Sequence, residues 1–227
     1  MSCNPAESER IRVLVVDDQQ LYAQGTVALL GIEPRILVVG VARNGTECLC
    51  LVGDTRPHVV LLDIDLLYSN EINYIAGIKK VQPGTKIIIM TGQNLQDYIS
   101  LTMKKGPEGI LLKDCSFKEM TQAIFRVAEG GICFPQSSEF FLPGLKNGTR
   151  LTFSPKLTKD KLKLLTTKEI EIMELVVEGF HNKEIAGILG LKVRAVDLHF
   201  RNILSKLEVS TRFEAALWWA YVDNKAF

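Results

Sequence analysis

Four short apolar segments in the first half of the chain each end beside a residue that can handle a phosphoryl group. In chain order, the residues that follow these segments are Asp17 and Asp18, Asp63, Thr91, and Lys113. Clustered carboxylates can hold a divalent cation, and Mg²⁺ prefers oxygen ligands of this kind. A hydroxyl and an ammonium group can contact phosphoryl oxygens, and such charge compensation supplies most of the catalysis in phosphoryl transfer. The pattern predicts a phosphoryl-transfer pocket that binds Mg²⁺.

The elements that must position these residues alternate in type between residues 11 and 130. Runs rich in Val and Ile, typical of buried parallel strands, occupy residues 11–16, 36–41, 59–62, 87–90 and 110–112. Helix-like stretches lie between or after them, at 21–30, 46–52, 71–81, 95–104 and 116–129. This alternation predicts an α/β doubly wound, flavodoxin-like fold with a five-stranded parallel sheet. Such sheets bind ligands at the carboxyl ends of their strands, where the predicted pocket lies.

Composition places the chain among ordinary globular proteins. Its 227 residues are enough for two modest domains, and its net charge of +1 predicts neither a nucleic-acid nor a membrane partner. The five cysteines are an odd number without Cys-x-x-Cys spacing, which indicates reduced thiols and argues against zinc. The N-terminal residues are polar, and no apolar stretch is long enough to span a bilayer. We expect a cytoplasmic protein.

The second half of the chain changes character twice. Residues 131–160 carry scattered Pro and Gly and then several Lys, which predicts a linker, whereas residues 161–227 are helical in pattern. We therefore expect domains at 9–130 and 161–227. In the second, Thr166 and Glu169 predict a capping box, and Asn182 can cap a short helix that ends before Gly190.

The next helix, predicted from about Val193 to Leu207, has one apolar and one polar face. The apolar stripe comprises Val196, Phe200, Ile203, Leu204 and Leu207, and the opposite face carries Arg194, Asp197, Leu198, Arg201 and Ser205. A short helix, a three-residue turn and this longer helix fit a helix-turn-helix, whose second helix enters the major groove of DNA. Periodicity alone slightly favours a simple helical bundle instead, because the net charge from Lys156 onward is near neutral.

The strings VLVVDDQQ, VVLLDID, IIIMTG and GILLKD, in this order over residues 9–130, resemble the receiver domain of two-component response regulators. The resemblance implies that Asp63 is the phospho-acceptor, charged from the phosphohistidine of a sensor histidine kinase. It implies that Asp18 and Asp63 bind Mg²⁺ directly, Asp17 through water and Asp65 through its carbonyl. Lys113 and Thr91 would sense the phosphoryl group.

Two departures from the receiver pattern affect its switch. The position three residues before Lys113 is usually aromatic, but here it is Ile110, which is β-branched and stiff. The loop after Asp63 lacks the Pro and Gly that are common there. One alternative is therefore a DNA-binding regulator whose receiver works independently of phosphorylation. A second, weaker alternative is a haloacid-dehalogenase-like phosphatase, with Asp63 as nucleophile and Asp65 as general acid, although that family has its metal-binding acidic pair downstream.

The C-terminal string LTTKEIEIMELVVEGFHNKEIAGILGLKVRAVDLHFRNILSKLEVSTRFEAA resembles the LuxR-type helix-turn-helix, and with the receiver it resembles response regulators of the NarL/FixJ class. The residues that this resemblance assigns to DNA binding are Lys183, Lys192, Arg194, Asp197, Leu198 and Arg201. Lys192 stands where a serine usually caps the recognition helix, and Asp197 replaces a lysine that meets DNA. An aspartate is repelled by phosphate, so we expect Asp197→Lys to strengthen general DNA binding.

The last helix is apolar nearly all round, which is more than one buried face requires. In the resembled class this helix dimerises on DNA, so we expect Trp218 and Trp219 to take part in dimerisation; a stable core is the alternative. Together, the patterns and resemblances predict a transcriptional regulator rather than an enzyme. Its expected partners are double-stranded DNA, a sensor histidine kinase, a second copy of the chain and RNA polymerase.

Overall fold

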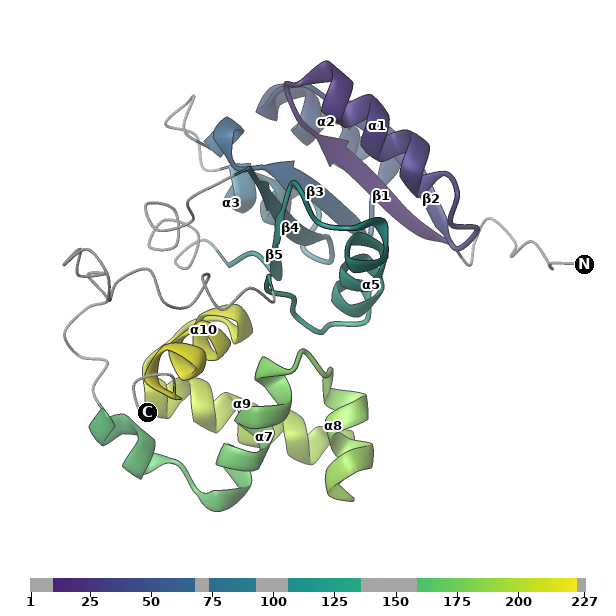
Figure 1. Cartoon of the computed structure of the whole chain (residues 1–227). Coiled ribbons are helices and arrows are strands. Elements are labelled where there is room, and N and C mark those ends of the chain that lie inside the picture. The colour runs from purple at the N-terminus through teal and green to yellow at the C-terminus, as the bar shows by residue number, and fades with distance from the viewer. Residues whose placement is uncertain (1–9, 68–73, 93–105, 136–158, 224–227) are drawn as a thin grey trace, which may run out of the picture. The chain divides into compact units, whose positions relative to one another are not determined.

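The computed structural model describes residues 10–67, 74–92, 106–135 and 159–223. They fold into two compact units (Figure 1). Of the described residues, 10–67, 74–92 and 109–128 belong to the first unit, and 106–108, 129–135 and 159–223 belong to the second. The predicted helix at 95–104 and most of the predicted linker lie outside the described residues. No helix in the described part of the chain is long and apolar enough to cross a membrane.

The first unit is built on a five-stranded, wholly parallel sheet in the order β2-β1-β3-β4-β5. Its strands are β1 (Ile11–Val16), β2 (Ile36–Ala42), β3 (Val59–Asp63), β4 (Lys86–Thr91) and β5 (Gly109–Leu112). The strand order reverses between β1 and β3, and Val16 pairs with Leu62 there. Asp17 and Asp63, one residue further along each strand, therefore meet at the point where open α/β sheets bind ligands. The predicted fold class is confirmed.

Helices cover both faces of this sheet, so its central strands are buried on both sides. They are α1 (Gln20–Leu30), α2 (Gly45–Thr55), α3 (Tyr74–Val81) and α5 (Phe117–Ala128), with a 3₁₀ turn, η2, at Asp65–Leu67. Helix α1 contacts α5, and α2 contacts α3. A capping box precedes α5, because Ser116 Oγ accepts from the Glu119 N–H and the Glu119 carboxylate accepts from the Ser116 N–H.

The second unit is helical. It contains a 3₁₀ segment η4 (Lys159–Leu164) and the helices α7 (Thr167–Val177), α8 (Asn182–Leu189), α9 (Val193–Leu207) and α10 (Arg212–Asp223). The capping box between Thr166 and Glu169 is confirmed. The cap of α8 was predicted one residue too late: the N-cap is His181, which with Glu184 forms a capping box, and Asn182 is the first helical residue.

One core holds the second unit together. Val196, Ile203 and Leu207 from α9 are fully buried in it, as the apolar stripe predicts. Two residues from the segment predicted as a linker also belong to this unit: Ile132 is buried in its core, and the ring of Phe134 stacks on Phe213 with centroids 4.7 Å apart. The core fixes the position of α9, whose other face is the predicted DNA-reading surface.

Candidate functional site

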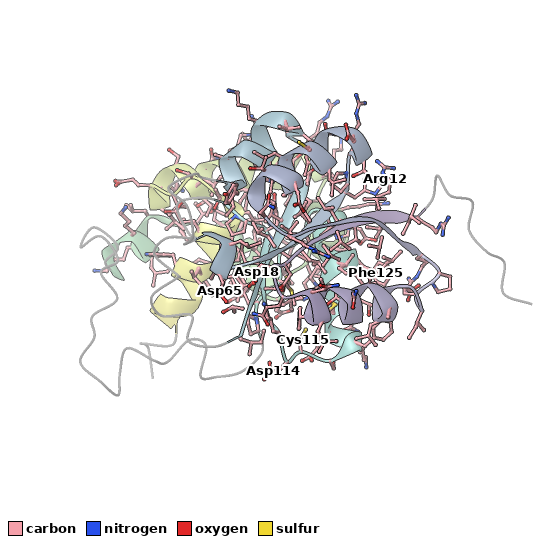
Figure 2. The ribbon with its side chains drawn as sticks, turned by 90° about the horizontal axis from the view of Figure 1, so that it is seen from above. Arg12, Asp18, Asp65, Asp114, Cys115 and Phe125 are labelled. Carbon is pink, nitrogen blue, oxygen red and sulfur yellow. The ribbon has the colours of Figure 1, made fainter. Side chains whose placement is uncertain are left out.

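The three predicted carboxylates form a cluster at the end of β1 and β3. Ligand oxygens of Asp17, Asp18 and Asp63 all lie within 4.8 Å of one another. Asp63 is completely buried and Asp17 nearly so, whereas Asp18 is exposed. Figure 2 shows the side chains of Asp18 and Asp65 toward one end of the sheet and that of Arg12, near the start of β1, toward the other. The cluster thus has an open side through Asp18 and a closed side at Asp63.

Lys113 neutralises part of the charge of this cluster. Its ammonium nitrogen lies 2.9 Å from Asp17 Oδ2 and 2.9 Å from Asp63 Oδ2. The main chain holds it in place, because the Lys113 N–H donates to the Thr91 carbonyl at 2.7 Å. Tyr22 in α1 adds two contacts: its hydroxyl donates to the Lys113 carbonyl at 3.1 Å, and its ring centroid lies 4.8 Å from the ammonium nitrogen.

Burial and charge act in opposite directions on these groups. Burial raises the pKa of the Asp63 carboxyl, and the charge of Asp17 adds to the rise, while the hydrogen bond from Lys113 opposes it. Burial alone would lower the pKa of Lys113, but its contacts with Asp17 and Asp63 outweigh this, and the pKa is raised. Lys113 therefore stays a cation. Additional positive charge beside Asp63 would stabilise the ionised form of its carboxyl group.

The donor set of the pocket suits Mg²⁺. Its oxygens are hard ligands, and three carboxylates face one ammonium ion, so the pocket keeps a negative charge that a divalent cation can offset. Asp65 lies beside the cluster in η2, where its N–H donates to Asp63 Oδ1 at 3.4 Å. Thr91 is buried at the end of β4, next to Lys113. The pocket can hold a cation and present a carboxylate to an incoming phosphoryl group.

The predicted switch position lies inside the sheet, two residues before the end of β5. Ile110 is completely buried in β5, and it pairs with Ile89 of β4. Residues 64–67 of the loop after Asp63 are described, whereas 68–73 are not.

The helix-turn-helix geometry is present in the second unit. Helices α8 and α9 are joined by three residues, 190–192, and Gly190 makes the turn with a φ of +64°. Helix α9 begins after Lys192, which offers no side-chain cap, as expected. Its exposed stripe carries the predicted DNA-facing residues Arg194, Leu198 and Arg201.

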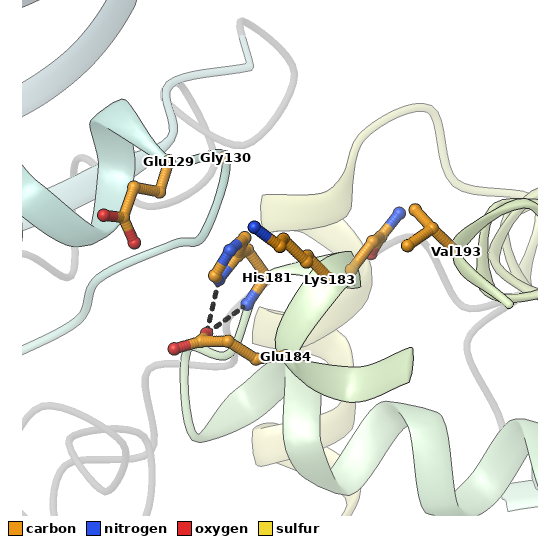
Figure 3. A pocket seen from close by; sticks show the side chains of 7 residues that line it. Glu129, Gly130, His181, Lys183, Glu184 and Val193 are labelled. Carbon is orange, nitrogen blue, oxygen red and sulfur yellow. Dashed lines mark hydrogen bonds and ion pairs between the residues drawn. The ribbon is translucent and has the colours of Figure 1, made fainter. Parts of the chain in front are cut away.

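Asp197 lies differently from its neighbours on α9. Leu198 is 57 % exposed, but Asp197 is half-buried, and its Oδ1 accepts a hydrogen bond from Asn182 Nδ2 at 2.6 Å. Figure 3 shows the start of α8, where the imidazole of His181 and the carboxylate of Glu184 are joined beside exposed Lys183. Lys183 is thus available at the surface, whereas Asp197 has a partner inside the unit.

Both tryptophans of α10 are inside the second unit. Trp218 is completely buried and Trp219 is 8 % exposed, and both belong to its core. The structure therefore gives them a core role within one chain, and any dimer contact by their indole rings would require this core to open. A role in dimerisation stays a prediction.

The sequence did not reveal two residues that organise these sites. Tyr22 supports Lys113 from 91 positions away, and Arg212 binds Asn182 across 30 positions. The aromatic residue in α1 and the arginine that opens α10 were visible, but their partners lie too far along the chain for periodicity to connect them.

Comparisons with known proteins match both units. Residues 13–125 match the family described as response regulator receiver domain, and residues 163–219 match the luxR family of bacterial regulatory proteins. The transcriptional regulatory protein LnrK of Bacillus subtilis is 31 % identical over 210 residues, which cover 92 % of this chain and 96 % of that protein. The nitrate/nitrite response regulator NarL of Escherichia coli K12 is 26 % identical over 213 residues, 94 % and 96 % of the two chains.

Solved structures agree in fold. The signal receiver domain of a NarL protein from Mycobacterium tuberculosis is 28 % identical, with a TM-score of 0.50 over 54 % of this chain and 98 % of that one. A structure of RcsB dimers bound to DNA has a TM-score of 0.51 and 24 % identity over 94 % of this chain and 99 % of that one. At that identity the second likeness shows the fold alone.

Proposed function

This chain belongs to the response regulators that join a receiver domain to a LuxR-type DNA-binding domain, and we propose that Asp63 is the phospho-acceptor through which it is controlled. As a member of this family it is a DNA-binding transcriptional regulator. The geometry of Asp17, Asp63 and Lys113 gives this assignment its strongest support. A buried carboxylate there lies beside a second carboxylate and 2.9 Å from an ammonium ion, at the switch point of a parallel sheet.

The residues of the pocket have separate roles in the proposed reaction. A bond forms between a carboxylate oxygen of Asp63 and phosphorus, and the bond from phosphorus to its donor breaks. Asp17, Asp18 and Asp63, with the main-chain carbonyl of Asp65, would hold Mg²⁺, which supplies positive charge next to the phosphoryl oxygens. Lys113 is held within reach of those oxygens by the Thr91 carbonyl and by Tyr22, and Thr91 is the hydroxyl donor.

The second unit would carry the response to DNA. Arg194, Leu198 and Arg201 form the surface that enters the major groove, and Lys183 and Lys192 approach phosphates. Two copies would bind two half-sites, with RNA polymerase as a further partner, and a sensor histidine kinase would supply the phosphoryl group. The proposed domain limits are 9–130, 131–160 and 161–227, and the proposed location is the cytoplasm.

Intact mass tests the receiver. Incubation with Mg²⁺ and a small acyl phosphate is expected to add one phosphoryl group to the folded wild-type chain. Asp63→Asn, which keeps the size of the side chain but not its nucleophilic carboxylate, is expected to gain none. An adduct of equal amount in Asp63→Asn would contradict the assignment of Asp63. Addition of a metal chelator is expected to abolish the wild-type adduct.

Ile110 supports a second candidate, in which the receiver regulates DNA binding without phosphorylation. A fully buried β-branched side chain, whose χ1 rotation is restricted, replaces the usual aromatic one. Equal DNA affinity of the unphosphorylated protein and of phosphorylated protein, verified by mass, would support this candidate. The phosphatase alternative predicts instead rapid phosphate release from a small phosphomonoester, lost in Asp65→Asn; we propose that the chain does not catalyse this turnover.

A further inference from the structure

Asp197 lies on the recognition helix α9, where the resembled class has a lysine, and it has a hydrogen-bond partner within its own unit. Its Oδ1 accepts from Asn182 Nδ2 at 2.6 Å, which links α9 to the first residue of α8. Asn182 has a second bond: its Oδ1 accepts from Arg212 Nη1 at 2.6 Å. The amide thus uses its carbonyl and its NH₂ group at once, and it joins an acid in α9 to a base in α10.

Arg212, at the other end of this hydrogen-bond network, has further contacts that hold it in place. Its Nη2 donates to the Phe180 carbonyl at 2.6 Å, and its guanidinium carbon lies 4.8 Å from the centroid of the Phe200 ring. Burial lowers the pKa of Arg212 to about 10, and the charge of Asp197 opposes that fall. Because the guanidinium group is bound on three sides, the amide of Asn182 is held in one orientation, and Asp197 receives its N–H in a fixed direction.

The exposed stripe of α9 does not include Asp197 as a freely accessible side chain. Arg194, Leu198 and Arg201 are exposed at spacings of four and three residues, which places them on one stripe of the helix. Asp197 lies at the edge of this stripe, half-buried and turned to α8. A carboxylate bound to a neighbouring helix is less free to repel phosphate or to accept from a base.

We propose that Asp197 is a positioning residue, which holds α9 against α8 and α10 through Asn182 and Arg212 so that Arg194, Leu198 and Arg201 meet the DNA bases in register. These hydrogen bonds join α9, α8 and the first residue of α10 in one network. This reverses the expectation drawn from the charge of Asp197 alone: Asp197→Lys removes the acceptor for Asn182 and brings a second cation toward Arg212. It weakens sequence-specific binding instead of strengthening it.

The experiment uses the full-length chain and two DNA probes. One is the duplex that the wild-type protein enriches from a random-sequence library, and the other has the same base composition in shuffled order. Wild type is compared with Asp197→Ala, Asp197→Lys, Asp197→Asn and Asn182→Ser, with folding checked by circular dichroism. Asp197→Asn keeps an oxygen that can accept from Asn182, so it is the conservative variant.

Positioning predicts losses confined to the enriched duplex. Asp197→Ala and Asp197→Lys are expected to lose about ten-fold or more in affinity for it, as is typical when a hydrogen bond to a charged group is removed, and Asp197→Asn regains most of that loss. Affinity for the shuffled duplex, and its dependence on salt, change little in Asp197→Ala. A merely structural role would lower binding to both probes in proportion to the unfolded fraction.

Asn182→Ser provides the second line of evidence, because it leaves both charges in place. It is expected to cause the same selective loss, and combining it with Asp197→Ala is expected to add little, since both changes break one link. If Asp197→Ala fails to fold, Asn182→Ser and Asp197→Asn carry the test.

Direct contact between Asp197 and DNA predicts a different result and would overturn the inference. If Asp197 repelled phosphate, all three substitutions of Asp197 would raise affinity for both duplexes, and Asp197→Lys would steepen the salt dependence by about one phosphate contact. If Asp197 accepted a hydrogen bond from a base, its substitutions would lower affinity for the enriched duplex, but Asn182→Ser, which leaves Asp197 in place, would not. Additive effects of Asn182→Ser and Asp197→Ala would overturn it as well. Failure of the wild-type protein to enrich any duplex would count against DNA binding itself, and the inference would fall with it.

Discussion

The two units of this protein treat their charged residues in opposite ways. In the first unit, three carboxylates converge within 4.8 Å, and Lys113 is the cation that bridges two of them. In the second unit, ion pairs tie helices together: Lys206 lies 2.6 Å from buried Glu169, and Lys161 lies 3.2 Å from Glu208 at the end of α9. Charge that stays incompletely neutralised therefore indicates a ligand site, whereas charge paired across elements indicates a structural role.

This contrast predicts that damage to the scaffold of one unit leaves the pocket of the other working. Trp218→Ala removes a completely buried indole from the second core and is expected to cost about 3–5 kcal/mol in the free energy of unfolding of that unit. Circular dichroism and a DNA shift assay should both report the loss, while phosphorylation of Asp63 persists. Ile188→Ala, at an exposed position of α8 outside the predicted DNA-facing residues, is the control. Simultaneous loss of phosphorylation would show that the units are not separable.

A second test places the same change at two positions of α2. At Gly45, an added Cβ would lie 1.7 Å from a carbon of the Tyr74 ring, whereas at Gly53 its nearest contact is 3.7 Å away, at Val81. Gly45→Ala is expected to destabilise the first unit by about 1–3 kcal/mol through overpacking. Gly53→Ala is expected to stabilise it by about 0.5–1 kcal/mol, because alanine favours helix interiors. Urea unfolding of both variants measures the difference, and equal effects would contradict the close packing of Tyr74 on Gly45.

Adding Mg²⁺ tests whether the excess negative charge of the three carboxylates over Lys113 binds a cation. Saturating Mg²⁺ is expected to stabilise the wild-type first unit by about 1–2 kcal/mol, because it binds the folded site and not the unfolded chain. Without the metal, Asp18→Asn is expected to be at least as stable as wild type, since it removes one of three like charges, and it should gain less from Mg²⁺. Thermal unfolding with Mg²⁺ or with a chelator provides the measurement. A gain in Asp18→Asn equal to that of wild type would argue that the ion binds elsewhere.

The smallest expected effect concerns pH at the opposite end of the sheet from the pocket. His58 Nδ1 accepts the main-chain N–H of Arg12 at 3.2 Å, which requires a neutral ring. Burial lowers the pKa of His58 below its ordinary value of 6.5, and the charge of Arg12 lowers it further. The stability that this contact adds is complete above pH 6.5 and declines as pH falls from there toward the folded-state pKa, because the unfolded chain binds the proton first.

His58→Asn provides the matched variant, since its amide oxygen can accept near the position of Nδ1 and does not titrate. Urea unfolding across this pH range should show a shallower slope for His58→Asn than for wild type. An identical slope in the two proteins would show that His58 does not contribute to the pH dependence of stability.

Local patterns predicted most of the first unit because its chemistry follows from chain order. The residues after the apolar runs had to meet once the runs became parallel strands, and the pairing of Val16 with Leu62 brings Asp17 beside Asp63. The boundaries of β1 and the capping boxes at Thr166 and Ser116 follow from patterns a few residues long.

The second unit was harder to predict because its special features depend on distant partners. The polarity of Asp197 indicated an outward face, but its bond to Asn182 spans 15 positions and the bond from Asn182 to Arg212 spans 30. The sequence of α10 is more apolar than one buried helix face requires, which suggested that Trp218 and Trp219 contact a second chain. Both side chains are instead buried in the core of the second unit. Periodicity reports which side chains avoid water, and it does not report which polar side chains find each other.

We propose that phosphorylation of Asp63 in the first unit changes DNA binding by the second. The most direct measurement is the affinity for the enriched duplex before and after treatment with Mg²⁺ and an acyl phosphate, with the adduct verified by mass and Asp63→Asn treated in parallel. Phosphorylated wild type is expected to bind about ten-fold or more tightly than the unphosphorylated protein, and Asp63→Asn is expected to show no change. Equal affinity of phosphorylated and unphosphorylated wild type would contradict it.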